Sequence, residues 1–211
     1  MTIINASEVK AFSGVPQESL STAKIAPFVD DSVAYLFLNS LSTTLLDAMV
    51  ADMVDYSTVT AWAAGTYTIG QKCRVDGIVY EALKSTTNKP TLTATDWKIP
   101  AKFTTPCLEI IWLKLRRLVC LTVLSDMMGL MLTKLDDNGA TRATGQNFEA
   151  AGVYHSEQLA TSVQNLKVQS WALFMDWFKN QTACNYSSYY LNCSISQYQT
   201  LGNLTRRINV G

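Results

Sequence analysis

The chain has 211 residues, of which 48% are hydrophobic and 16% are charged. The apolar content is high enough for a folded core and excludes a disordered protein, while the length excludes a large multidomain enzyme. Seventeen basic residues balance seventeen acidic residues, so the positive charge that nucleic-acid binding proteins use against phosphates is missing. We therefore expect a folded protein that makes no direct sequence-specific contact with nucleic acid.

The net charge of zero conceals an uneven distribution along the chain. Residues 1–56 contain seven acidic residues against two lysines, whereas residues 57–105 contain six basic and three acidic residues. Two surfaces of opposite charge suit the head-to-tail packing of identical subunits. A random scatter of surface charge is the alternative interpretation.

The five cysteines are scattered, and no two of them have the separation that a metal knuckle or a redox motif requires. We expect them to be reduced in an intracellular protein. The first residues also lack the charged start and the apolar run of a secretory signal.

The most apolar segment, residues 108–132, contains five charged residues. Each charge costs a few kcal/mol at the centre of a bilayer. We therefore expect a buried helix of a soluble protein here and no membrane span.

Apolar residues recur at helical spacing in the first part of the chain. Residues 25–37 and 41–53 both show the three- and four-residue steps of amphipathic helices. The pattern predicts two helices, or one helix interrupted at residues 39–40. The turn-forming residues 14–16 are expected to open a helix that follows them.

Residues 57–105 differ in character, and we call this segment the β module. It contains short β-favouring runs broken by glycine, and Asp76-Gly77 is the dipeptide that most readily forms a two-residue hairpin turn. A unit this small has little room for a core, so its aromatic side chains are expected to supply most of its stability. The sequence predicts an antiparallel β module inserted between helices.

Helical spacing returns after Pro106. One apolar stripe covers residues 108–122 and a second pattern covers residues 144–179, which as one helix would be roughly 50 Å long. Residues 136–139, Asp-Asp-Asn-Gly, form a strong helix breaker between them.

The expected fold class is therefore mainly α. A helical bundle is predicted from residues 1–56 and 106–182, with the β module inserted between them and an extended C-terminal arm at residues 183–211.

Catalytic constellations are weak in this sequence. His155 is the one histidine, and its neighbour Ser156 does not face it on a helix, so we expect a surface or packed histidine. Asp136 and Asp137 lack the alternating oxygen ligands of a calcium loop and suit a turn. Glycine-rich phosphate loops are absent, whereas a spatially formed carboxylate pair stays open. We expect no enzyme, no metal and no cofactor.

The β module resembles the small carbohydrate-binding modules of chitinases, similar copies of which occur in phage structural proteins. The matching residues are Tyr67, Gly70, Val75, Gly77, Tyr80 and the late Trp97, with Trp62 at the position of the opening aromatic. In that family exposed aromatic rings stack on sugar rings. The resemblance makes Trp62, Tyr67, Tyr80 and Trp97 the candidate glycan-facing residues, and the alternative is that these rings form the module core.

Residues 24–47 resemble the early helices of phage head-tail connector proteins. In that family an Ile-x-Pro-Phe-Ile segment leads into a leucine-rich run, which corresponds here to Ile25-Ala-Pro-Phe28-Val29 and the residues that follow. Ser42 stands where the family usually has glycine. The resemblance implies a homo-oligomeric ring of about twelve copies beneath a portal protein.

The C-terminal arm is rich in tyrosine and lacks helical spacing. A tyrosine can bury its ring while its hydroxyl stays in water, which suits an interface anchor, and a disordered arm in the isolated monomer is the alternative. The candidate interface residues are Tyr186, Tyr189, Tyr190, Tyr198, Arg206 and Arg207.

These observations and the connector resemblance predict a non-enzymatic structural protein of the virion. It is expected to be a ring adaptor in the neck of a tailed phage that joins the portal to further neck or tail proteins. Assembly is expected in the host cytoplasm, and no association with a membrane is expected. A carbohydrate-binding accessory protein that uses the β module is the alternative. A hydrolase dependent on His155 or on a carboxylate pair is a third hypothesis.

Overall fold

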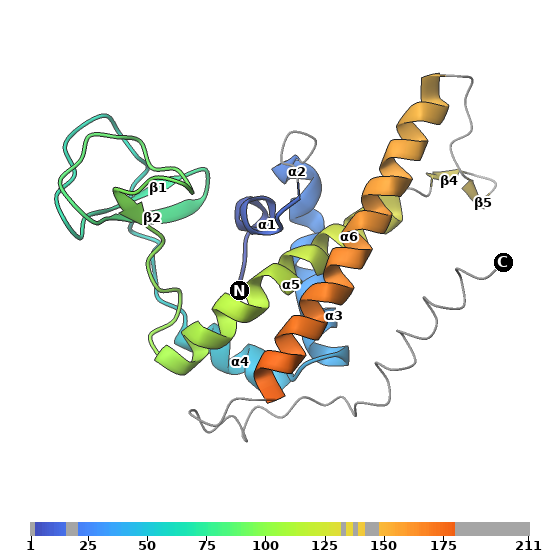
Figure 1. Ribbon diagram of the computed structural model, residues 1–211, viewed down its shortest axis with the longest axis horizontal. Helices are drawn as coiled ribbons and strands as arrows, with labels where there is room; N and C mark the ends of the chain where they lie inside the picture. Colours follow the sequence, from blue (N-terminus) through green and yellow to red (C-terminus); the bar gives the residue numbers. More distant parts are fainter. Residues whose placement is uncertain (1–2, 16–20, 132–133, 137–138, 142–147, 180–211) are drawn as a thin grey trace.

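A computed structural model describes residues 3–15, 21–131, 134–136, 139–141 and 148–179, and describes the backbone alone within residues 130–157 and at residue 179. The chain is mainly helical and carries a small three-stranded antiparallel sheet (Figure 1). This confirms the prediction of a mainly α chain with a small β module.

The first helix, α1 (Ala6–Phe12), is an element that the apolar spacing did not predict. It begins with a capping box, in which the Asn5 side chain accepts from the Glu8 amide at 2.9 Å and the Asn5 amide donates to Glu8 Oε2 at 3.0 Å. These two bonds satisfy amide groups that a helix start leaves without partners. Asn-x-x-Glu was therefore the sequence signal for this helix.

The following helices form one stretch that is broken once. The elements are α2 (Thr22–Ile25), the 3-10 turn η1 (Ala26–Phe28), α3 (Val29–Asn39) and α4 (Thr43–Asp52). Of the two possibilities that the spacing left open, the structure has two separate helices, α3 and α4. The predicted opening turn is described as far as Val15, and Pro16 lies outside the described residues.

Helix α5 (Pro106–Met131) lies at the centre of the helical part. All side chains from Leu118 to Leu124 are buried, so this stretch is covered on every side rather than along one stripe. The one hydroxyl among them, on Thr122, donates to the Leu118 carbonyl at 2.9 Å. The charged residues of α5 lie outside this stretch, and none of the described helices is long and apolar enough to span a membrane.

Helix α6 (Phe148–Lys179) packs along α5, and Ser125 Oγ of α5 donates to Gln164 Oε1 of α6 at 2.9 Å. Thirty-two residues correspond to roughly 48 Å. The predicted long helix is thus described from Phe148, and its first four expected residues lie outside the described part. Before it, β4 (Lys134–Asp136) and β5 (Gly139–Thr141) pair antiparallel, which the sequence did not predict.

The helical part, called the helical body below, has one hydrophobic core. Helices α1, α3, α4, α5 and α6 all contribute to it. Its largest fully buried side chains are Phe37, Phe103, Phe174, Ile3, Ile4, Ile25, Leu41, Leu45, Met49, Ile111, Leu115 and Leu118.

The sheet consists of β1 (Lys72–Val75), β2 (Ile78–Ala82) and β3 (Trp97–Lys98), in that order. Asp76 and Gly77 connect β1 to β2 with φ angles of 49° and 80°. Positive φ at both central residues is the geometry of a two-residue hairpin turn that follows the strand twist. The hairpin predicted from Asp76-Gly77 is confirmed.

We expect Gly77→Ala to destabilise the protein by about 2 kcal/mol, because alanine is strained at positive φ and its Cβ would lie 3.1 Å from Ser7 Oγ. Gly70→Ala is the matched control: its φ of 82° is equally unfavourable, but no atom lies within 4 Å of the added Cβ. It should cost about 1 kcal/mol. Urea unfolding of both variants measures the difference, and equal losses would show that the Ser7 contact contributes nothing.

The cysteines differ from the expectation of five reduced thiols. Cys73 and Cys120 are free and buried, but Cys107 is disulfide-bonded, so the expectation is wrong for this residue. Spacing along the chain did not reveal this bond, because a disulfide depends on spatial distance.

Candidate functional site

The four candidate aromatics of the β module are all at least partly buried. Tyr80 and Trp97 are each 4% exposed and belong to the core of the module, while Trp62 and Tyr67 are half-buried and pack against it. The Tyr67 ring meets the Trp97 ring edge-on, with centroids 5.3 Å apart. Trp97 Nε1 donates to the Asn88 carbonyl at 3.1 Å. These contacts assign Tyr80 and Trp97 to the scaffold.

Trp62 is the one of the four that keeps an unusual feature. Its indole Nε1 is buried and has no hydrogen-bond acceptor within the described part of the chain, and Lys89 Nζ lies 5.9 Å from the centre of its ring. A buried N–H without an acceptor costs free energy. The ring itself packs against the module core, whereas its N–H has no acceptor in the described part of the chain.

Residues 52–56 and 101–105 run side by side and form the connection between the module and the helical body, here called the stem. Met53 pairs with Phe103, and the Val54 amide donates to the Lys102 carbonyl at 2.9 Å. The Tyr56 hydroxyl donates to the Ala101 carbonyl at 2.7 Å. These bonds therefore join the two segments that connect the helical body to the β module.

Asp52, the last residue of α4, accepts hydrogen bonds from the two residues that precede α5. Its carboxylate accepts from the Thr104 hydroxyl and from the amide and the hydroxyl of Thr105. These hydrogen bonds lower the pKa of the Asp52 carboxyl, the Thr104 hydroxyl having the largest effect and the Thr105 amide the next largest. An acidic side chain is favourable beside a helix N-terminus. This arrangement joins the end of α4 to the start of α5.

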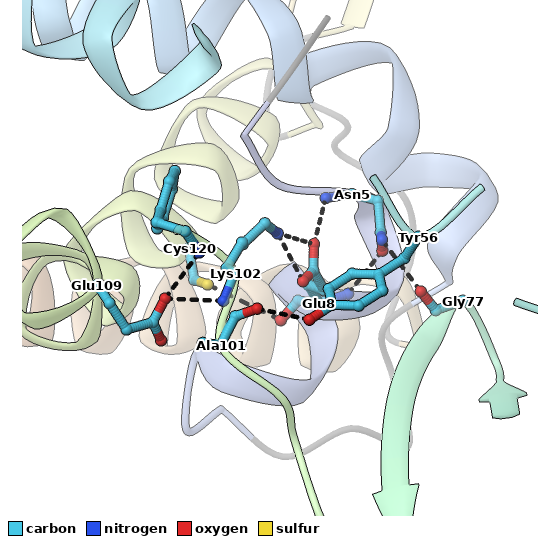
Figure 2. A network of polar contacts seen from close by, with 9 residues as sticks. Asn5, Glu8, Tyr56, Gly77, Ala101, Lys102, Glu109 and Cys120 are labelled. Atoms are coloured by element: carbon cyan, nitrogen blue, oxygen red, sulfur yellow. Dashed lines mark hydrogen bonds and ion pairs between the residues drawn. The ribbon is translucent and has the colours of Figure 1, made fainter. Parts of the chain in front are cut away.

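A largely buried ion pair ties α1 to the stem (Figure 2). Lys102 Nζ lies 2.7 and 2.8 Å from the two carboxylate oxygens of Glu8, and both side chains are less than a fifth exposed. Lys102 Nζ also lies 5.1 Å from the centre of the Trp112 ring. Asn5 completes the link by donating from its side chain to the Gly77 carbonyl at 3.2 Å. Helix α1 therefore contacts both the stem and the hairpin turn of the module.

A cleft of about 870 Å³ opens between the β module and the helical body. Helix α1, the start of α5, the stem, and strands β2 and β3 contribute to its walls. Arg74 lies on the module side, where its Nη2 donates to the Tyr56 carbonyl at 2.6 Å. Arg116 lies on the α5 side, with its guanidinium 4.1 Å from the centre of the Phe12 ring.

The cleft combines charged groups of both signs with apolar surface, because the carboxylates of Asp55 and Glu109 line it beside the guanidinium groups. Within the described chain neither guanidinium, of Arg74 or of Arg116, has a carboxylate within ion-pair distance, whereas Lys102 is neutralised by Glu8. Ile99 and Leu113 on the walls are 39% and 51% exposed.

Nucleophilic chemistry has little support among the described side chains. Burial raises the pKa of the Cys73 thiol, and also that of the Cys120 thiol, so both are held as neutral thiols. No group of three or more metal-ligating side chains occurs among the described residues. His155 lies in α6, where side chains are described only from Gln158 onward.

The candidate interface residues of the C-terminal arm lie outside the described residues, which end at Lys179. These are Tyr186, Tyr189, Tyr190, Tyr198, Arg206 and Arg207. Their proposed role stays a prediction.

The loop before β3 is held by Asp96. Its carboxylate lies 2.7 Å from Lys84 Nζ and accepts from the Thr86 hydroxyl and the Asn88 side-chain amide at 2.9 Å each. Together these donors, with Lys84 the strongest, lower the pKa of Asp96 from 3.8 to about 2.

We expect the ionisation of Asp96 to make the free energy of unfolding depend on pH. A carboxyl with a lowered folded-state pKa stabilises the fold above its ordinary pKa, and this stabilisation is lost as the pH falls from 3.8 toward about 2. Asp96→Asn should therefore be less stable than the parent protein at neutral pH, and the difference should vanish near the lower value. Unfolding measured across this pH range tests it, and a difference that stays constant with pH would contradict it.

Comparisons of this chain with protein-family models, with curated proteins and with solved structures found no match.

Proposed function

We propose that this chain is a structural, non-enzymatic subunit of a ring adaptor that joins the portal of a tailed phage to the rest of the neck. The observation that carries the proposal is the exposure of large apolar side chains on three neighbouring helices, α3, α5 and α6. These side chains are Tyr35, Leu38, Ile110, Leu113, Val168 and Leu173, which are between 43% and 70% exposed.

Single exposed apolar residues are normal on protein surfaces. Six large ones on helices that pack against one another are typical of surfaces that other chains cover. The helical body already has a filled core, so these side chains are not needed inside it. Burial by identical neighbours or by a portal accounts for them.

Helix α6 supports the same proposal. Among its side chains from Gln158 onward, Val163, Ser170 and Phe174 are the buried ones, and its N-terminal end stands clear of α3 and α4 (Figure 1). A long helix that packs along one side gains most of its stability from that contact. Its other side is then available to a neighbouring subunit, in keeping with the bundle and extended arm that the connector resemblance implies.

The carbohydrate-binding alternative has less support. No aromatic ring in residues 57–105 is fully exposed. Trp62 and Tyr67 are half-buried, and the remaining rings, of Tyr80, Trp97 and Phe103, are buried. Sugar stacking needs the face of an accessible ring. We therefore regard the aromatics of the module as structural.

Co-purification with the portal protein of the same phage tests the proposal. We expect the chain to bind the assembled portal, and Leu173→Asp to weaken this binding at least about tenfold, because the substitution places a charge at the 70% exposed Leu173. Thr161→Asp, on an exposed position of the same helix, is the matched control and should bind like the parent protein. A chain that does not bind the portal would contradict the proposal.

A further inference from the structure

We infer that Cys107 forms its disulfide with Cys184, and that this bond attaches the beginning of the C-terminal arm to the start of α5 until a dithiol reduces it. The attachment of the arm then depends on the redox state of the chain. This inference goes beyond the proposed ring adaptor function and does not depend on it.

The partner of Cys107 is limited by the state of the other cysteines. Cys107 is disulfide-bonded, whereas Cys73 and Cys120 are free. The chain has five cysteines, so the second sulfur within the chain belongs to Cys184 or to Cys193. Both residues belong to the C-terminal arm and lie outside the described residues. With either partner, the bond joins the start of α5 to the arm.

The packing of α6 on α5 favours Cys184. Helix α6 runs back along α5 (Figure 1), and the two helices meet where Ser125 donates to Gln164. From this pair, at 1.5 Å per residue, α5 extends about 27 Å back to Cys107 and α6 extends about 22 Å forward to Lys179. The end of α6 therefore comes close to the level of Cys107 along the helix pair.

Both ends of the connection are held by the helical body. Phe174 of α6 is buried, its ring stacks on Phe178 with centroids 5.6 Å apart, and Trp177 and Phe178 pack against the core. Cys107 packs against the same core. The last turns of α6 are therefore fixed on the body that also holds Cys107.

The length of chain beyond α6 separates the two possible partners. Cys184 is five residues beyond Lys179, and an extended chain spans at most about 17 Å over that length. This covers the remaining step along the axis and the roughly 8 to 10 Å between packed helices. Cys193 would close a longer loop, which costs more conformational entropy. The geometry therefore assigns the bond to Cys184.

The bond is open to thiol–disulfide exchange. Cys107 is half-buried, whereas Cys73 and Cys120 are each 0% exposed. To close the bond, the thiols of Cys107 and Cys184 each give up a proton and together give two electrons to a small disulfide, which leaves as two thiols. A dithiol reverses the reaction and is itself oxidised to a disulfide. The bond is therefore expected to be open in a reducing compartment and closed in an oxidising one.

Peptide mapping of the full chain tests the pairing. The protein is treated with oxidised glutathione, digested with chymotrypsin without a reductant, and analysed by mass spectrometry. Chymotrypsin cleaves after tyrosine, and Tyr186, Tyr189 and Tyr190 stand between the two cysteines of the arm, so these fall on different peptides. We expect the Cys107 peptide of the monomer to be joined to the Cys184 peptide. A bond to Cys193, a bond between two copies, or a reduced Cys107 would overturn the inference.

Thermal unfolding tests the attachment and its dependence on redox state. Dithiothreitol should lower the unfolding temperature of the parent protein by about 5 °C or more, because a cross-link restricts the unfolded chain. Cys193→Ser is the matched control and should respond like the parent, whereas Cys184→Ser and Cys107→Ser should not respond. Circular dichroism before heating confirms that each variant is folded. A parent protein that unfolds at the same temperature with and without dithiothreitol would overturn the inference and leave the proposed function standing.

Discussion

Phe103→Ala is expected to reduce the free energy of unfolding by about 3 to 5 kcal/mol, the usual cost of removing a buried phenylalanine ring. Phe103 lies in the stem but is 2% exposed and belongs to the core of the helical body, where its ring meets Trp112 edge-on at 6.0 Å. The loss leaves a cavity where the module joins the body. Chemical denaturation with linear extrapolation measures the effect.

Two substitutions serve as controls for Phe103→Ala. Phe103→Leu keeps most of the apolar volume and should cost about 1 kcal/mol. Leu92→Ala removes a side chain that is 46% exposed on the module and should cost less than about 0.5 kcal/mol. If Phe103→Ala costs no more than Leu92→Ala, Phe103 does not anchor the stem in the core.

Lys102→Met is the second large effect, and we expect a loss of about 2 to 4 kcal/mol. The substitution leaves the Glu8 carboxylate largely buried without its ammonium partner, and an uncompensated buried charge is expensive. Lys84→Met is the matched control because Lys84 pairs with Asp96 but is 62% exposed. That pair should contribute less than about 1 kcal/mol.

A double variant distinguishes the cost of leaving the Glu8 charge unpaired from the cost of changing the packing of the Lys102 side chain. Glu8→Gln combined with Lys102→Met removes both charges, while the new side-chain amide at position 8 can still accept from the Asn5 amide as the Glu8 carboxylate does. We expect the double variant to be more stable than Lys102→Met alone. Thermal unfolding of the three proteins decides this, and a double variant that is less stable than the single one would refute the assigned role of the ion pair.

Local signals in the sequence predicted most of the elements. Asp76-Gly77 specified the hairpin because few dipeptides tolerate positive φ at both positions. The apolar steps on either side of residues 39–40 located α3 and α4, and the apolar segment at residues 108–132 predicted the buried helix α5. In each case the chain within a few residues determines the structure.

The candidate site depended on long-range contacts that no local pattern contains. Glu8 and Lys102 are 94 positions apart, and the sequence around each residue does not indicate that the two side chains form an ion pair. The cleft forms only because the stem brings the module against α1 and the start of α5. The short capping box of α1 was readable from Asn5 and Glu8, but apolar spacing gave too few turns to indicate a helix.

The burial of Tyr80 and Trp97 follows from the size of the module. Its core consists of Cys73, Ile78, Tyr80, Ala82 and Trp97, so the large rings supply most of the apolar volume. A segment this small cannot both fill its core and expose the same rings to a ligand. We therefore expect Tyr80 and Trp97 to stabilise the module core and not to contact a ligand.

Cryo-electron microscopy of the chain assembled with the portal of the same phage tests the central claim most directly. The proposal predicts a closed ring of identical copies on the portal, with the exposed side chains of α3, α5 and α6 buried between subunits or against the portal. A chain that remains a monomer beside intact portal rings, or that binds them with these side chains still exposed to solvent, would contradict it.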